Sequence, residues 1–180
     1  MTESLDNEIS ELLFRKYKLI WEGYQRRPTF FTANNCTREL TCIMGAQSFS
    51  WRVVGITRAA LSIYRAVGYQ PNLKTSKSQG KDLIRLGNPK IQRGHIYPRI
   101  ETARELITRP LLPDPEVFIS FWLERDVTVL CGPGENRKEI PGDYIKINNP
   151  NGEYFTSTSA GFRYKFAREG KLLQSLDIST

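Results

Sequence analysis

The clearest pattern of hydrophobic and polar positions lies at the start of the chain. Over residues 4–24 large apolar side chains recur every three or four residues, the period of an amphipathic helix. Acidic residues come first and basic residues later, the order that suits the helix dipole, and Ser4 can cap the start. The pattern therefore predicts an N-terminal helix within residues 1–27 that ends before Pro28.

The next stretch gives shorter and more mixed patterns. Residues 29–32 predict a short strand, and residues 37–44 fit either a helix or a strand. Residues 50–56 concentrate β-branched and aromatic side chains and predict a strand. Thr57 is a suitable N-cap for a following helix over 57–67, which a glycine ends.

A long basic loop is predicted in the middle of the chain. Residues 70–94 hold six basic residues among many Gly, Pro, Asn and Ser residues, with one helical turn expected near 82–86. Residues 91–97 predict a short strand or extended segment at the end of this loop. Long loops in compact domains are usually functional or mobile, so we expect this one to be so.

The second half of the chain alternates helices and strands. The predicted elements are a helix over 98–108, a helix over 117–125 capped by Asp114, a buried strand over 127–131, a strand over 144–147, and a helix over 162–176. No internal repeat is evident. The order predicts a mixed α+β fold in a single domain over 1–180, with an N-terminal helix, short strands and a long basic loop.

Composition supports a folded protein that does not enter a membrane. Of 180 residues, 39% are hydrophobic and 11% aromatic, enough for a core. No apolar run has the length of a membrane span, and the first ten residues are acidic and polar, unlike a signal peptide. Cys36, Cys42 and Cys131 predict three buried thiols in a reducing compartment rather than a disulfide or zinc site. We therefore expect a cytoplasmic protein without a membrane partner.

The distribution of charge is the most informative feature of the composition. The formal net charge is +7, but residues 52–109 carry twelve Lys and Arg against three acidic residues, a net charge of +9. The other 122 residues have a net charge of −2. Such clustering favours a polyanionic partner, because Lys and Arg that contact phosphates release condensed counterions. The alternatives are a solvated basic face, an acidic protein partner and a small phosphate ligand.

His95, the one histidine of the chain, is the first candidate for catalysis. It lies inside the basic segment, between a glycine and a predicted helix. An imidazole can take a proton from an attacking water near neutral pH. Cleavage of a phosphodiester also needs the charge of the phosphate offset, for which Arg93, Arg99 and Arg104 are available. Glu105, one turn from Glu101 on the same helix face, could supply an oxygen ligand for Mg2+.

The residues around His95 resemble a known motif. Residues 93–98, RGHIYP, resemble the Arg-Gly-His-(apolar)-x-Pro segment of the His-Me finger (ββα-metal) nucleases that cut DNA and RNA without sequence preference. The resemblance implies that His95 is the general base and Arg93 a phosphate-facing cation. It further implies an Asn on a later helix as a ligand of one divalent metal. That Asn is missing from the predicted helix over 117–125, and Asn136 is the nearest one downstream.

Two other arrangements compete with this hypothesis. Asp126, Glu135 and Lys138 faintly resemble the acid–acid–lysine arrangement of restriction-enzyme-like nucleases, although surface turn charges are the alternative interpretation. The predicted helix over 57–67, followed by a basic loop, could instead be half of a helix-turn-helix unit.

Stacking on unpaired bases is a further alternative, with Trp51, Tyr69 and Tyr97 as the candidate aromatic residues, although core packing is the commoner role of such side chains. No phosphate-binding P-loop, dinucleotide fingerprint or Ser or Cys nucleophile motif occurs, which argues against an ATPase, a Rossmann oxidoreductase and a triad hydrolase.

The sequence therefore predicts a nucleic-acid-binding protein that is a magnesium-dependent DNA endonuclease of restriction, homing or phage type. The alternatives are a non-catalytic DNA-binding regulator and an RNA-binding protein. A homodimer is expected if both strands of a palindrome are cut. The candidate catalytic residues are His95, Arg93, Arg99 and Arg104. The candidate nucleic-acid-binding residues are Arg58, Arg65, Lys74, Lys77, Lys81, Arg85, Lys90 and Tyr97. The candidate metal ligands are Glu105 and Asn136.

Overall fold

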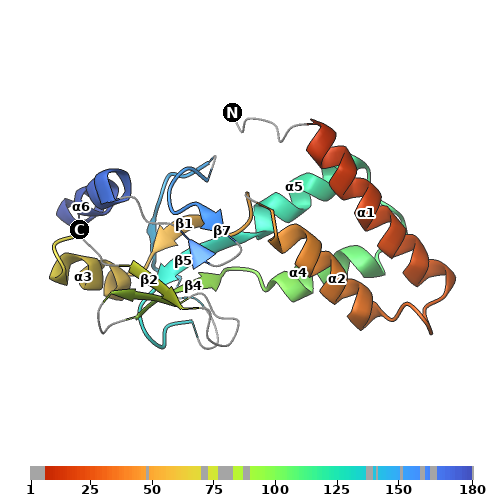
Figure 1. The fold of residues 1–180 in the computed structure, drawn as a ribbon, viewed down its shortest axis with the longest axis horizontal. Coiled ribbons are helices and arrows are strands. Elements are labelled where there is room, and N and C mark those ends of the chain that lie inside the picture. The colour runs from red at the N-terminus through yellow and green to blue at the C-terminus, as the bar shows by residue number, and fades with distance from the viewer. Residues whose placement is uncertain are drawn as a thin grey trace. The chain divides into compact units, whose positions relative to one another are not determined.

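The chain folds into helices and strands (Figure 1), and these belong to two compact units. The computed structural model describes residues 7–47, 49–69, 73–76, 83–86, 90–136, 140, 142–150, 152–158, 161–162 and 166–179. Unit 1 consists of residues 1–50 and 97–126, and unit 2 of residues 51–96 and 127–180. Unit 1 is helical and unit 2 contains the main sheet, so the predicted α+β class is confirmed.

Unit 1 is built from four helices around one apolar core. They are α1 (Asn7–Arg26), α2 (Ala33–Gly45), α4 (Arg99–Thr108) and α5 (Pro115–Arg125). Tyr17 of α1 is fully buried and stacks on Phe118 of α5, with ring centroids 4.4 Å apart. Its hydroxyl donates to the Leu106 carbonyl of α4 at 2.9 Å, so a single side chain connects three helices.

In unit 1 the helices predicted from an apolar pattern that extends over many residues are confirmed. The N-terminal helix and the helices at 98–108 and 117–125 are present, but the strand predicted over 29–32 is wrong. Residues 28–30 form a turn, and Thr32 is the N-cap of α2, its hydroxyl accepting from the Asn35 amide at 3.3 Å. The ambiguous segment over 37–44 is therefore helical. Cys42 on this helix is exposed, so the expectation of three buried thiols is wrong as well.

Unit 2 is organised around a mixed sheet in the order β2-β3-β4-β5-β1-β6. Its strands are β1 (Arg52–Ile56), β2 (Leu73–Ser76), β3 (Leu83–Leu86), β4 (Lys90–His95), β5 (Val127–Cys131) and β6 (Ile145–Lys146). β1 and β5 are parallel, and every other pair is antiparallel. β5 is buried along its whole length, as its central place in the sheet requires.

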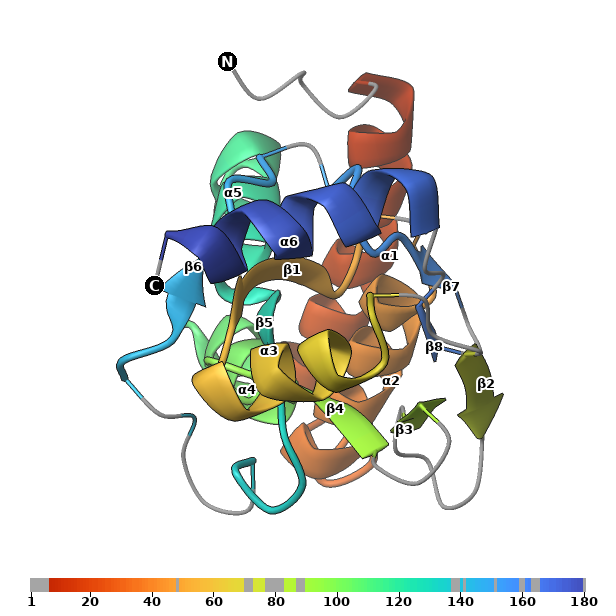
Figure 2. The same ribbon diagram turned by 90° about the vertical axis from the view of Figure 1, so that its left-hand side faces the viewer.

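One face of the sheet is covered by α3 (Arg58–Ala66) and α6 (Lys171–Ile178), as Figure 2 shows. Tyr64 of α3 and Leu173 of α6 are fully buried against Ile56 and Leu130 of the strands. Thr57 caps α3 as predicted, since its hydroxyl accepts from the Ala60 amide at 3.2 Å. The face of the sheet that packs against α3 and α6 is therefore a core face of unit 2.

The segment predicted as a long loop contains strands. β2, β3 and the start of β4 fall within 70–94, and the helical turn expected near 82–86 is wrong because β3 occupies 83–86. A π-helix, Phe166–Gly170, precedes α6, so the last helix begins later than residue 162. The short strands β7 (Ser157–Thr158) and β8 (Gly161–Phe162) form a separate pair.

Candidate nucleic-acid interface

The two units differ sharply in charge. Unit 2 contains sixteen Lys and Arg against seven acidic residues, a net charge of +9. Unit 1 contains ten against twelve, a net charge of −2. The whole positive excess of the protein therefore belongs to the unit with the large sheet.

Strand register brings three basic residues of unit 2 into directly paired positions. Lys74 of β2 is paired with Arg85 of β3, which is paired with Lys90 of β4. Registered partners on neighbouring strands share one face of a sheet. We call these three positions the basic row.

The opposite face of the same strands carries mostly apolar positions. Leu73 is paired with Leu86, and Ile84 with Thr75 and Ile91, and these positions alternate with those of the basic row. Ile91 is fully buried in the core of unit 2, so this face is the core face. By alternation the basic row is on the other face, which it shares with the position of Leu83.

His95 and Arg93 lie on the core face of β4, because they alternate with Lys90 and share a face with Ile91. Both side chains pack on Trp51. The Cζ atom of Arg93 is 4.7 Å from the centroid of the indole, and the His95 and Trp51 ring centroids are 4.4 Å apart. Arg93 is only 5% exposed, so its guanidinium is inside the unit rather than on the surface.

The backbone of Trp51 is in a strained conformation. Its φ of 65° lies in the left-handed region, which costs a non-glycine residue on the order of 1–3 kcal/mol. The hydroxyl of Thr128 donates to the Trp51 carbonyl at 3.1 Å, and Thr128 is the registered partner of His95. The sheet thus holds the indole in place beside the imidazole. Strain of this kind often accompanies functional sites.

Asn136 is in unit 2 with His95 but on the other side of the sheet. Its Nδ2 donates to the Arg93 carbonyl at 3.2 Å, and a Cβ added to Gly94 would lie 3.2 Å from the Asn136 Cβ. Gly94 alternates with His95 along β4, so Asn136 covers the face opposite the imidazole. The chain before it forms a turn at 133–136 rather than the helix that the nuclease resemblance implies.

Glu105, the other candidate metal ligand, belongs to unit 1 and is already occupied. Its Oε2 accepts from Nη1 of Arg125 at 2.5 Å, and its Oε1 lies 3.6 Å from Nη2 of Arg109. Two arginines beside a carboxylate disfavour a cation there. Glu105 is thus bound by two arginines and Asn136 lies on the sheet face opposite His95, and the magnesium site stays a prediction. Among the described residues, no group of three or more His, Cys, Asp or Glu is placed to hold a metal ion.

Arg99 has a structural role that the sequence did not indicate. Its Nε and Nη2 donate to the two carboxylate oxygens of Asp126 at 2.7 and 2.9 Å, and the Asp126 side chain is 2% exposed. A Cβ added to Gly45 would lie 2.5 Å from Nη1 of Arg99, so the guanidinium also packs on α2. Arg99 therefore holds unit 1 together rather than facing a phosphate. Arg104 is exposed on α4 of the same unit.

In the acid–acid–lysine alternative, the two carboxylates that the structure describes, Asp126 and Glu135, are both bound by other residues. Asp126 is bound by Arg99, and Oε2 of Glu135 accepts from the Thr57 hydroxyl at 2.5 Å and the Gly132 amide at 2.6 Å. Glu135 thus ties the turn after β5 to the start of α3. Burial, with Glu135 nearby, raises the pKa of the Cys131 thiol to about 11. Lys138 lies outside the described residues.

The remaining candidates are dispersed. Arg58 is exposed at the start of α3, and Tyr97 is exposed in unit 1 with Arg125 over its ring. Arg65 is engaged, its Nε donating to Oδ2 of Asp177 of α6 at 2.6 Å. Two further candidates, Lys77 and Lys81, lie outside the described residues.

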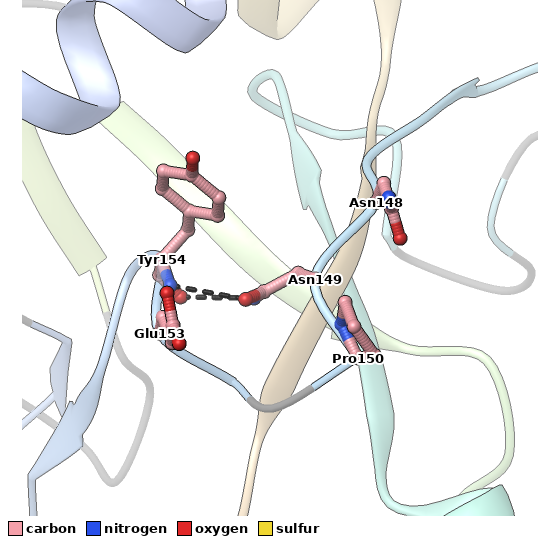
Figure 3. A pocket seen from close by; sticks show the side chains of 5 residues that line it. All are labelled: Asn148, Asn149, Pro150, Glu153 and Tyr154. Carbon is pink, nitrogen blue, oxygen red and sulfur yellow. Dashed lines mark hydrogen bonds between the residues drawn. The ribbon is translucent and has the colours of Figure 1, made fainter. Parts of the chain in front are cut away.

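A small pocket of about 140 Å3 in unit 2 is not an anion site. Asn148, Asn149, Pro150, Glu153 and Tyr154 line it (Figure 3). The Asn149 side chain is bound to the backbone, its Nδ2 donating to the Val53 and Tyr154 carbonyls and its Oδ1 accepting from the Tyr154 amide, each at 3.0 Å. The charged residue in this lining is an acid, so the pocket does not favour phosphate.

Comparisons with family models, curated proteins and solved structures gave no match to this chain. None of the described helices combines the length and the apolar character needed to cross a bilayer. The candidate interface therefore rests on the charge, register and packing of the chain itself.

Proposed function

We propose that this protein binds nucleic acid, with double-stranded DNA as its partner, through the basic unit 2. The carrying observation is that unit 2 has a net charge of +9 while unit 1 has a net charge of −2. A solvated surface needs no such separation, whereas attraction to a phosphate backbone is strengthened by it.

Phosphodiester hydrolysis at His95 is the second candidate function. It is favoured by the imidazole's place beside a strained Trp51 and the guanidinium of Arg93. In this proposal His95 takes the proton of an attacking water, and the positive charge of Arg93 offsets the negative charge that develops on the phosphate. Asn136 has no part in it, because it covers the sheet face opposite His95.

Binding is tested by titrating the full chain with labelled duplex DNA and competing with unlabelled DNA, RNA and polyglutamate. We expect DNA to compete at far lower concentration than polyglutamate at equal charge. Equal competition by polyglutamate would indicate an acidic protein partner and contradict the proposal.

Hydrolysis is tested with plasmid DNA and with RNA, in the presence of Mg2+ and in the presence of chelator. Replacing His95 with Ala should reduce cleavage at least about a hundredfold, the usual contribution of a general base, with duplex affinity kept within a few-fold. Cleavage by His95→Ala at the rate of the natural protein would remove the base assignment. Absence of cleavage by the natural protein with any divalent metal would leave a binding protein without catalysis.

A further inference from the structure

We infer that the basic row, Lys74, Arg85 and Lys90, is the surface that contacts the phosphates of duplex DNA, and that this contact is made on the opposite sheet face from His95. The inference rests on the proposed binding function and adds its site. His95 lies on the core face of β4 with Arg93, so a duplex held by the basic row does not reach the imidazole, and hydrolysis at His95 would require a different contact with the substrate.

The first step of the argument is the register of the three strands. β2, β3 and β4 form an antiparallel ribbon in which Lys74, Arg85 and Lys90 are successive partners. Neighbouring strands are about 4.8 Å apart, so the row spans roughly 10 Å from β2 to β4. That span is close to the width of the major groove of B-DNA, about 12 Å.

The second step is the separation of the two faces of the ribbon. The core face includes the fully buried Ile91 of β4, so this face is committed to folding there. On the row's face, Asn136 and Ile140 lie over Gly94, four residues along β4 from Lys90. The basic row is therefore at the end of the ribbon away from the segment that packs over Gly94.

The third step decides between classes of nucleic acid. The major groove of B-DNA admits a two-stranded β-ribbon such as β2 and β3 at the end of the sheet, whereas the major groove of an RNA duplex is too deep and narrow for side chains to read. Three cations spaced across an extended ribbon match a phosphate backbone better than a single small anion, which would engage one of them. Duplex DNA is the occupant that the geometry favours.

The experiment compares two triple variants with equal loss of charge. Lys74→Gln, Arg85→Gln and Lys90→Gln are combined in the row variant. The control combines Lys16→Gln, Lys146→Gln and Lys171→Gln, three exposed cations outside the ribbon. Affinity for duplex DNA is measured over a range of salt concentrations, and circular dichroism checks that both variants fold.

We expect the row variant to lose roughly 10- to 100-fold in affinity near 0.1 M salt and to flatten the log–log salt dependence by about 2 to 3 units. The control should lose a few-fold at most. An equal or larger loss in the control would overturn the inference while leaving nucleic-acid binding intact. Absence of DNA binding by the natural protein would instead contradict the proposed function itself. Tighter binding of duplex RNA than of duplex DNA would overturn the groove assignment.

A second measurement needs no variant and covers the case of a row variant that does not fold. Lysine amines of the natural protein are acetylated with and without duplex DNA, and the modified positions are read by mass spectrometry. DNA should protect Lys74 and Lys90 several-fold and leave Lys146 and Lys171 unchanged. Protection of Lys146 and Lys171 without protection of the row would overturn the inference.

Discussion

Gly55 lies in β1, where the ring of Tyr144 packs directly over its backbone. A Cβ at this position would be 2.2 Å from Cδ2 of Tyr144 and 3.1 Å from the carbonyl oxygen of Ile145. No carbon can approach an aromatic ring so closely, so the ring or the strand would have to move. The glycine is thus required by the close approach of Tyr144 rather than by a turn.

We predict that Gly55→Ala destabilises the protein by about 1–3 kcal/mol, the usual range for overpacking in a core. Gly142→Ala is the matched control, because a Cβ there would meet no atom within 4 Å. It should change the free energy of unfolding by less than about 0.5 kcal/mol. Urea denaturation of both variants checks the prediction, and equal stabilities would show that Tyr144 does not pack over β1 in this way.

Between elements, the contact of α3 with α6 depends on a charged cluster. Arg65 and the hydroxyl of Tyr69 both donate to the carboxylate of Asp177. The hydrogen bond from Arg65, followed by that from Tyr69, holds the pKa of Asp177 below its usual range. A carboxyl group whose pKa is lowered in the folded state stabilises that state above its unfolded pKa of about 3.9.

We therefore predict that the contribution of Asp177 is constant near neutral pH and is lost as the pH falls from about 4 through the lower pKa of the folded state. Asp177→Asn should be less stable than the natural protein above about pH 5, and the difference should shrink in acid. Urea denaturation at a series of pH values measures it. A difference that does not change with pH would mean that the carboxylate charge is not what joins the two helices.

The start of α4 and the end of α5 are joined by the buried pair of Arg99 and Asp126. Removing one partner leaves the other charge buried, which typically costs about 3–5 kcal/mol. We predict losses of that size for Arg99→Leu and for Asp126→Leu, and a double variant that loses far less than their sum. A thermodynamic cycle of the four proteins tests this. If the losses in unfolding free energy of the two single variants add up in the double variant, the pair is not coupled. Arg99 would then again be a candidate for phosphate contact.

The sequence predicted those elements whose cause is local. The helical period of α1, the Thr57 cap of α3 and the β-branched run of β5 are all visible in short windows of the chain. β2 and β3 were missed because each is four residues long and is stabilised by a partner strand rather than by its own composition. The available signal was leucine or isoleucine directly beside a basic residue in three short runs, LKTS, LIRL and KIQ.

The candidate site was predictable only in part for the same reason. The excess of positive charge is a property of composition, so the sequence gives it directly. The pairing of Arg85 with Lys74 on one side and with Lys90 on the other depends on register, which residue spacing alone does not fix. The residues His95, Arg99 and Glu105 are close in sequence, but the chain passes from unit 2 to unit 1 after residue 96. His95 therefore belongs to unit 2, whereas Arg99 and Glu105 belong to unit 1.

At the scale of the whole molecule, charge is divided between the units rather than spread over the surface. A net charge of +9 in unit 2 favours fast, salt-sensitive association with a polyanion. The net charge of −2 in unit 1 gives no such attraction. The account therefore requires that most of the binding free energy be electrostatic and originate in unit 2.

The salt dependence of duplex affinity tests this central claim most directly. Each phosphate neutralised by Lys or Arg contributes about −0.9 to the slope of log K against log salt. With the three cations of the basic row and further contacts from unit 2, we predict a slope between about −3 and −6 for the natural protein. Fluorescence anisotropy of a labelled duplex, titrated at a series of KCl concentrations, measures it. A slope near zero, or no binding at the lowest salt, would contradict the account.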